Sequence, residues 1–155
     1  MARPLVLRAV LWAAVLGLAA SLAVHLLTFT AYAPPPAALA LHLGVFVTVV
    51  PVLLAAKAWA EELAQNVGTI AGRLGVAKAL VDLIPTWQKA AFVLLALYVS
   101  VNFTVSLARL ADVPGAGSEF RLFSGHWMLF YALSAILSQR LRAPLPPPGP
   151  ERATS

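Results

Sequence analysis

The sequence contains no cysteine and few charged residues. Cysteine is absent from all 155 positions, which excludes disulfide bonds, thiolate metal sites, a cysteine nucleophile and a dithiol redox relay. Charged residues make up 11% of the chain, against roughly 25% in soluble domains, so too little polar surface is present to cover a folded sphere in water. With 61% hydrophobic residues and a mean hydropathy of +0.85, the chain is predicted to fold in a lipid bilayer.

Long apolar segments predict an all-α fold, an integral membrane four-helix bundle. The segments cover residues 9–31, 37–56, 90–108 and 122–138. Their lengths approach or exceed what a helix needs, at a rise of about 1.5 Å per residue, to cross a hydrocarbon core about 30 Å thick. Residues 1–143 are therefore predicted to form a four-span transmembrane domain. The Pro-rich residues 144–155 are predicted to be a disordered cytoplasmic tail.

The first apolar segment has a second interpretation, a cleaved signal peptide. Arg3 and Arg8 form a basic start, and residues 31–33 read Ala-Tyr-Ala, which resembles a cleavage site. The segment is longer than the roughly 7 to 15 residues of a signal peptide's apolar region, and Pro34 would directly follow the cut. A retained membrane helix is therefore the favoured interpretation.

The basic residues predict the orientation of these spans. If the N-terminus is cytoplasmic, nine of the 11 Lys and Arg residues lie on the cytoplasmic side, namely Arg3, Arg8, Lys57, Arg73, Lys78, Lys89, Arg140, Arg142 and Arg152. Only Arg109 and Arg121 then lie outside. This asymmetry is typical of a bacterial inner-membrane protein with both termini in the cytoplasm. It also explains the basic pI without a nucleic-acid partner, because the charges form no single patch.

The connection over residues 57–84 is predicted to be amphipathic and cytoplasmic. Trp59, Leu63 and Val67 recur at helical spacing, whereas Glu61 and Glu62 take the opposite face. The second helix is expected to continue past the membrane or to bend onto its surface. Two interpretations remain open, a packed or interfacial connector and a docking face for a cytoplasmic partner.

The three histidines of the chain are predicted to share one layer of the membrane. Counted from the outer ends of their spans, His25, His42 and His126 lie at similar depth, roughly 7 to 11 Å below the outer boundary. Ionisable groups inside spans usually face the bundle interior, where they mark ligand sites, proton paths or structural hydrogen bonds. The candidate partners in this polar layer are Asn102, Ser124, Trp127 and Tyr131.

Three interpretations of this polar layer remain open. The favoured one is hydrogen bonding between helices, which needs no cofactor. In the second, His25, His42 and His126 bind haem or a metal ion in a small redox protein, because neutral imidazole is a general ligand. The third is a quinone or lipid site, for which His126, Trp127 and Tyr131 would supply a hydrogen-bond donor and a stacking surface.

Residues 121–131 read R-L-F-S-G-H-W-M-L-F-Y and are the least generic part of the sequence. Trp127 and Tyr131 in this stretch fit an aromatic belt at the membrane interface. The stretch resembles an R-x-F-S-G-H-W-M-x-F-Y element of small, uncharacterised bacterial inner-membrane proteins. Residues 41–46 (L-H-L-G-V-F) and 23–29 (A-V-H-L-L-T-F) are similar to the same proteins. The resemblance implies a four-helix membrane protein and no particular activity.

The sequence lacks residues that several enzyme and transporter classes require. A small proton-coupled transporter needs a carboxylate inside a span, and no Asp or Glu lies in the predicted spans. Ser124 and His126 are two positions apart on one helix and point about 200° apart, so they form no catalytic dyad unaided. The sequence therefore favours a non-catalytic membrane subunit or accessory protein. Its expected partners are the lipid bilayer and either a second copy of the chain or a larger membrane complex.

Overall fold

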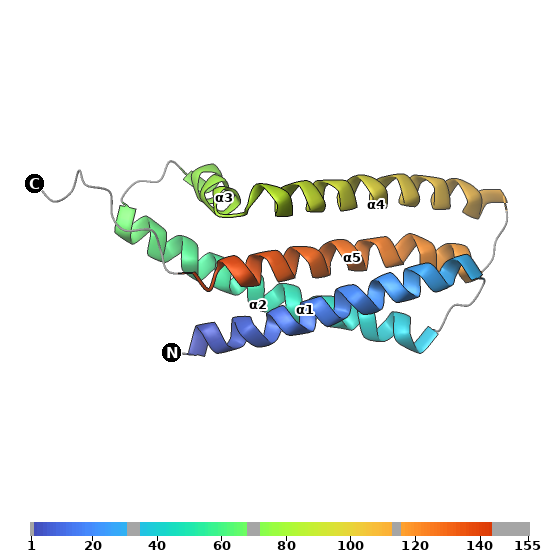
Figure 1. Ribbon diagram of the computed structural model, residues 1–155, viewed down its shortest axis with the longest axis horizontal. Coiled ribbons are helices and arrows are strands. Elements are labelled where there is room, and N and C mark those ends of the chain that lie inside the picture. Colours follow the sequence, from blue (N-terminus) through green and yellow to red (C-terminus); the bar gives the residue numbers. More distant parts are fainter. Residues whose placement is uncertain (1, 31–34, 68–71, 113–115, 144–155) are drawn as a thin grey trace, which may run out of the picture.

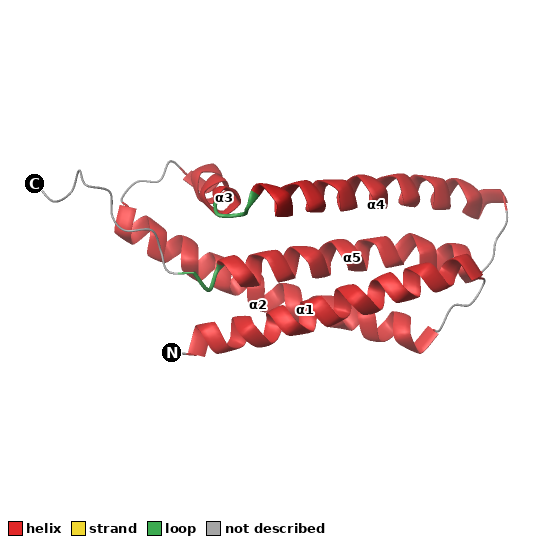
Figure 2. Ribbon diagram, viewed as in Figure 1, coloured by secondary structure: helices red, strands yellow, loops and turns green. Residues whose placement is uncertain are grey.

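The computed structural model describes residues 2–30, 35–67, 72–112 and 116–143. This part of the chain is helical and contains no strand (Figure 2). Its elements are α1 (Ala2–Leu27), the 3-10 turn η1 (Thr28–Thr30), α2 (Pro35–Val67), α3 (Gly72–Asp82), α4 (Thr86–Asp112) and α5 (Ala116–Arg140). The all-α prediction is confirmed. The predicted disordered tail, residues 144–155, lies outside the described residues.

Three stretches of these helices are long and apolar enough to cross a membrane. They are Pro4–Thr30, Pro36–Leu63 and Thr86–Ala108, which contain or overlap the first three predicted spans. The fourth predicted span, 122–138, is helical as part of α5. This segment is not apolar enough to be a candidate membrane span, because His126 and serines such as Ser124 and Ser134 interrupt its hydrophobic residues. The described residues therefore contain three candidate membrane helices, which suggest a membrane location.

Every long helix extends beyond the predicted apolar segment. α1 begins at Ala2, and α4 and α5 each start several residues earlier than their apolar cores. α2 runs without interruption through Pro51 to Val67, beyond residue 56, where the predicted apolar segment ends. These extensions arise because helices end at caps and prolines, whereas hydropathy marks only the apolar part.

α5 lies at the centre of the arrangement. In Figure 1, α1, α2, α4 and α5 run side by side, and α3 lies at the end where α1 begins. α5 contacts α1, α2 and α4, whereas α4 packs mainly against α5. Side chains on different faces of α5 therefore contact different helices, namely α1, α2 or α4.

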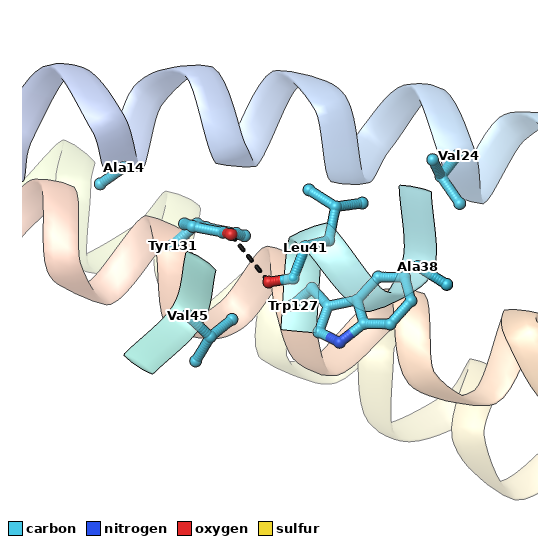
Figure 3. Close-up of a cluster of buried hydrophobic side chains, with 7 residues drawn as sticks. All are labelled: Ala14, Val24, Ala38, Leu41, Val45, Trp127 and Tyr131. Carbon is cyan, nitrogen blue, oxygen red and sulfur yellow. Dashed lines mark hydrogen bonds between the residues drawn. The ribbon is translucent and has the colours of Figure 1, made fainter. Parts of the chain in front are cut away.

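The buried apolar side chains form two clusters along the bundle. One cluster joins α1, α2 and α5 (Figure 3) and contains Ala14, Val24, Ala38, Leu41, Val45, Trp127 and Tyr131. The other lies toward the end that carries α3 and contains Leu7, Val10, Val52, Trp59, Leu63 and Leu141. Ala79 and Leu80 of α3 pack against this second cluster. The apolar face predicted at Trp59 and Leu63 is therefore packed inside the protein.

The outward faces of the long helices are apolar as well. Large exposed side chains include Trp12 and Leu16 on α1, Leu43 and Leu54 on α2, and Leu94 on α4, each more than half exposed. Soluble monomers rarely expose contiguous apolar surface on this scale. The outer surface of these helices is suited to hydrocarbon rather than to water.

Candidate functional site

A hydrogen-bonded network centred on His25 joins three helices. His25 lies on α1 and is 1% exposed. Its Nδ1 atom is 2.6 Å from the hydroxyl of Ser124 on α5, and its Nε2 atom is 2.5 Å from the hydroxyl of Tyr98 on α4. Tyr98 and Phe29 also meet the imidazole ring edge to face. Both ring nitrogens are therefore occupied, and the side chain is closed to an additional ligand.

The direction of each hydrogen bond in this network follows from Ser124. Its hydroxyl proton is donated to the backbone carbonyl of Arg121 at 3.1 Å, so Ser124 can only accept from His25. His25 then carries its proton on Nδ1 and accepts from the Tyr98 hydroxyl at Nε2. Asn102 of α4 donates to the same Arg121 carbonyl at 3.1 Å. The network thereby joins α1, α4 and α5 at one level.

The Arg121 side chain caps the C-terminal end of α1. One guanidinium NH2 donates to the Thr28 carbonyl at 2.8 Å, and Nε lies 3.4 Å from the Thr28 hydroxyl. The guanidinium carbon also lies 4.3 Å from the centre of the Phe29 ring. A cation at a helix C-terminus satisfies free carbonyls and opposes the negative end of the helix dipole. Arg121 is therefore a structural link between α5 and η1 as well as a charge near a helix end.

The contact between Ser124 and His25 does not make a nucleophile. Ser124 is fully buried and its proton already goes to a carbonyl, so no substrate can reach the hydroxyl. The second ring nitrogen of His25 meets Tyr98, where a catalytic histidine needs an orienting acceptor such as a carboxylate. His126, the histidine nearest to Ser124 in sequence, instead contacts the Leu122 carbonyl of its own helix. The arrangement joins helices and supports no acyl transfer.

His42 and His126 lie in a different environment from His25. Both line a cavity of about 530 Å³ between α2, α4 and α5. The Trp127 indole N–H lies 3.4 Å from Nδ1 of His42, and the His126 ring meets Phe103 edge to face. The structure thus divides the three histidines into one closed side chain and two that line a cavity. In the part of the chain that the structure describes, no three His, Asp or Glu side chains are placed to hold one metal ion.

Tyr131 is a buried wedge between α1 and α2, not part of an aromatic belt. It is 2% exposed, and Trp127 is 4% exposed, so the expectation of interfacial aromatics is wrong for both. The Tyr131 ring occupies notches left by Gly17 of α1 and Gly44 of α2. Its hydroxyl donates to the Leu41 carbonyl of α2 at 2.8 Å (Figure 3). A ring wedged between two helices in this way fixes their spacing.

A second polar link joins α4 and α5 toward the end that carries α3. The amide of Gln88 donates to Gln139 at 3.0 Å, and Arg140 donates to the carbonyl oxygen of the Gln88 side chain at 3.0 Å. Gln88 is 7% exposed. Because α4 packs mainly on α5, these bonds and the Tyr98 and Asn102 bonds hold it at two levels.

Each of the four polar partners named from the sequence makes a bond to another helix. Ser124 meets α1, Asn102 and Trp127 join α5 to α4 and α2, and Tyr131 joins α5 to α2. Sequence reasoning missed Tyr98 and the capping role of Arg121. The only signal for Tyr98 was its place one helical turn before Asn102, which puts both residues on one face.

Comparisons with protein-family models, curated proteins and solved structures found no match for this chain. The function is therefore inferred from the residues and their geometry alone.

Proposed function

We propose that the chain is a four-span bundle of the bacterial inner membrane, in which α5 is the fourth crossing helix. The observation that carries this proposal is the direction of the polar side chains on α5. Ser124 bonds to α1, Trp127 and Tyr131 bond to α2, and the Arg121 carbonyl accepts from α4. These polar groups of α5 are satisfied by neighbouring helices without water, whereas the buried hydroxyls of Ser134 and Ser138 have no hydrogen-bond partner in the described part of the chain.

The lower apolarity of α5 is consistent with a central position in a membrane bundle. A lipid-facing helix must be apolar around most of its circumference, whereas a helix enclosed by others needs apolar groups only where it meets lipid. Ser124, Ser134 and Ser138 are at most 1% exposed. Among residues 121–140, the part of α5 whose side chains the structure describes, the large exposed apolar side chains are Phe123 and Phe130, which are suited to hydrocarbon.

The bundle is proposed to have one orientation in the membrane, with the N-terminus and the C-terminus in the cytoplasm. The beginning of α1, helix α3 and the end of α5 lie at the same end of the molecule (Figure 1). This end carries Arg8, Lys57, Lys78, Arg140 and Arg142. The excess of basic residues marks the cytoplasmic side of inner-membrane proteins.

The biochemical role that fits this geometry is that of a non-catalytic subunit or accessory protein. The most buried ionisable group, His25, is committed to hydrogen bonds between helices, and no nucleophile is exposed beside a base in the described polar network. The exposed apolar faces of α1, α2 and α4 would contact lipid, a second copy or a larger membrane complex.

Single cysteines test the number of crossings, because the natural chain has none. Thr30→Cys, Ala77→Cys and Ala143→Cys would be introduced separately at exposed positions. Intact and permeabilised cells would then be treated with a membrane-impermeant maleimide. We expect labelling of position 30 in intact cells, and labelling of positions 77 and 143 only after permeabilisation.

The comparison of positions 77 and 143 is decisive for α5. If α5 crosses the membrane, two crossings separate these positions and both lie on the same side. If only three helices cross, position 143 labels in intact cells while position 77 does not, and the four-span proposal fails. The cysteine-free chain is the control for background labelling.

A further inference from the structure

A groove between α1, α4 and α5 begins at the end of the bundle that carries α3. Its volume is about 300 Å³, at the lower end of the range for small-molecule sites. Apolar side chains of all three helices, such as Val15, Phe92 and Ile136, form most of its wall. The amides of Gln88 and Gln139 also line it and bond to each other at 3.0 Å. The groove is therefore apolar along its length and polar at one end.

The groove follows the helices from this polar end toward the middle of the bundle. On α4 it extends from Trp87 to Leu95, which is about 12 Å at the rise of an α-helix. One leaflet contributes about half of a hydrocarbon core that is about 30 Å thick. Trp87 is 69% exposed and is suited to the membrane interface. The length and direction of the groove therefore match one acyl chain of the leaflet at the α3 end.

A cation without a counter-charge lies at the polar end of the groove. The Nη2 atom of Arg140 donates to the side-chain oxygen of Gln88 at 3.0 Å, so the guanidinium lies beside the groove. The ion pairs formed among the described residues do not include Arg140, and its Nε atom is buried without a hydrogen-bond partner. Its Nη1 atom has no partner in the described part of the chain either, but it is not buried. Because buried cations are normally paired, an anion from outside the chain would supply the partner that this charge lacks.

Two further groups at the same end of the groove can meet an anion. Gln139 accepts from Gln88 through its side-chain oxygen, which leaves its own N–H groups free to donate, and its side chain is exposed. Lys89 follows Gln88 in α4, and its ammonium group takes part in none of the ion pairs of the described residues. Guanidinium, amide and ammonium groups at one level are suited to a phosphate.

We propose that this groove binds an anionic glycerophospholipid, with one acyl chain along the apolar wall and the phosphate beside Arg140 and Gln139. Charge complementarity selects the anionic class, because the ammonium group of a zwitterionic lipid would meet the basic residues of this end, which include Lys89 and Arg142. The site rests on the proposed four-span bundle, since α5 has to lie in the bilayer with α1 and α4. It does not depend on which leaflet faces the cytoplasm.

Other occupants match the groove less well. A second copy in the same orientation would bring its own excess of basic residues to this level, so Arg140 would face charges of the same sign. A free phosphate would leave the apolar wall uncovered. A phospholipid covers the wall and also supplies the anion.

Native mass spectrometry of the full chain, delipidated in a non-ionic detergent, measures this binding directly. The probes are dioleoyl phosphatidylglycerol and dioleoyl phosphatidylcholine, which have the same acyl chains and differ in headgroup charge. We expect one phosphatidylglycerol per chain, bound at least fivefold more tightly than phosphatidylcholine. The cysteine labelling reports the membrane crossings independently. Four confirmed crossings together with equal affinities for the two lipids would therefore reject the lipid site alone.

Two arginine variants test the headgroup contact. Arg140→Gln removes the cation but keeps an amide that can donate to Gln88, and it should bring the two lipid affinities within twofold of each other. Arg142→Gln is the matched control, because it makes the same change of charge at an exposed side chain outside the groove. It should keep the preference for phosphatidylglycerol at fourfold or more.

Two alanine variants test the place of the acyl chain. Ala91 lines the groove, so Ala91→Phe should fill part of it and weaken the binding of both lipids about tenfold. Ala90 is its exposed neighbour outside the groove, and Ala90→Phe should change either affinity less than twofold. Thermal unfolding of each variant in lipid-free micelles would show that the bundle is intact.

Four results would overturn the proposal. Equal affinities of the natural chain for the two lipids would remove the charge selection. A loss of preference in Arg142→Gln as large as that in Arg140→Gln would reduce it to a general attraction of the basic end. Unchanged binding in Ala91→Phe would place the acyl chain outside the groove. Dimers that lose their stability in Ala91→Phe, without retained lipid, would assign the groove to a second copy.

Discussion

A single methyl group at position 44 tests how Tyr131 sets the spacing of α1, α2 and α5. A Cβ atom at Gly44 would collide with the Tyr131 hydroxyl oxygen, whereas the ring carbon Cζ would remain 3.4 Å away, an ordinary contact. A Cβ atom at Gly17 would collide with the ring carbons themselves. Removal of the hydroxyl in Tyr131→Phe therefore makes room at position 44 but not at position 17.

The magnitudes follow from overpacking and helix propensity. Overpacking costs about 1–3 kcal/mol, and alanine stabilises a helix interior by about 0.5–1 kcal/mol over glycine. Gly44→Ala should then lower the free energy of unfolding by about 0.5–2 kcal/mol. Tyr131→Phe loses the bond to the Leu41 carbonyl, worth about 0.6–1.5 kcal/mol. In the Tyr131→Phe background, Gly44→Ala should be neutral or stabilising, so the two changes couple favourably by about 1–3 kcal/mol.

The assay is equilibrium unfolding in mixed micelles, followed by tryptophan fluorescence, for the two single variants and the double variant. Gly17→Ala is the matched control, because the ring carbons that it meets are present in both tyrosine and phenylalanine. Its cost should be the same in both backgrounds. Additive effects of Gly44→Ala and Tyr131→Phe would refute the claim that the Tyr131 hydroxyl fills the space beside Gly44.

Three further predictions concern the polar contacts. His25→Leu, which removes bonds to two helices, should destabilise the bundle by about 1–3 kcal/mol, more than Tyr98→Phe at about 0.6 kcal/mol, as measured by unfolding in micelles. Arg121→Gln should cost about 1–3 kcal/mol through the lost cap on Thr28, and Arg121→Lys should not restore it in the same assay because the planar stack on Phe29 is lost. The hydrogen bond from Lys78 lowers the pKa of the Asp82 carboxyl below its ordinary value of 3.8. The ion pair is therefore present at pH values above the lowered pKa, and it is lost as the pH falls through that pKa. An NMR titration of Asp82 should therefore have its midpoint below 3.8, and Lys78→Ala should raise that midpoint.

The helical class could be predicted from the sequence because apolar runs and prolines are local signals. Residues 37–56 and 90–108 fall entirely within α2 and α4, and residues 9–27 of the first segment lie in α1. The ends of the helices were less predictable, because helix boundaries do not follow hydropathy: α4 begins at Thr86, before its apolar segment starts at residue 90. α5 was the hardest case, since its serines are polar by composition and buried in the structure.

The pairing of polar residues could not be predicted because it depends on the rotation of one helix against another. His25 and Ser124 are 99 positions apart, and nothing in one sequence fixes which face of α5 meets α1. The similar depth of His25, His42 and His126 suggested one cluster, but depth does not determine direction. His25 points toward α4 and α5, whereas His42 and His126 line the cavity on the other side of α5. Tyr131 was misassigned for the same reason, because the glycines that receive its ring lie on two other helices.

The most direct test of the central claim, that α5 crosses the bilayer as the core of the bundle, is the depth of Phe130. This residue lies in the middle of α5 and is 43% exposed. A nitroxide attached at Phe130→Cys would be compared with one at Ala77→Cys of α3, using oxygen and a water-soluble nickel complex as relaxation agents. Four crossings predict strong relaxation by oxygen and almost none by nickel at position 130, with the opposite pattern at position 77. Strong relaxation by nickel at position 130 would place α5 in water and contradict the claim.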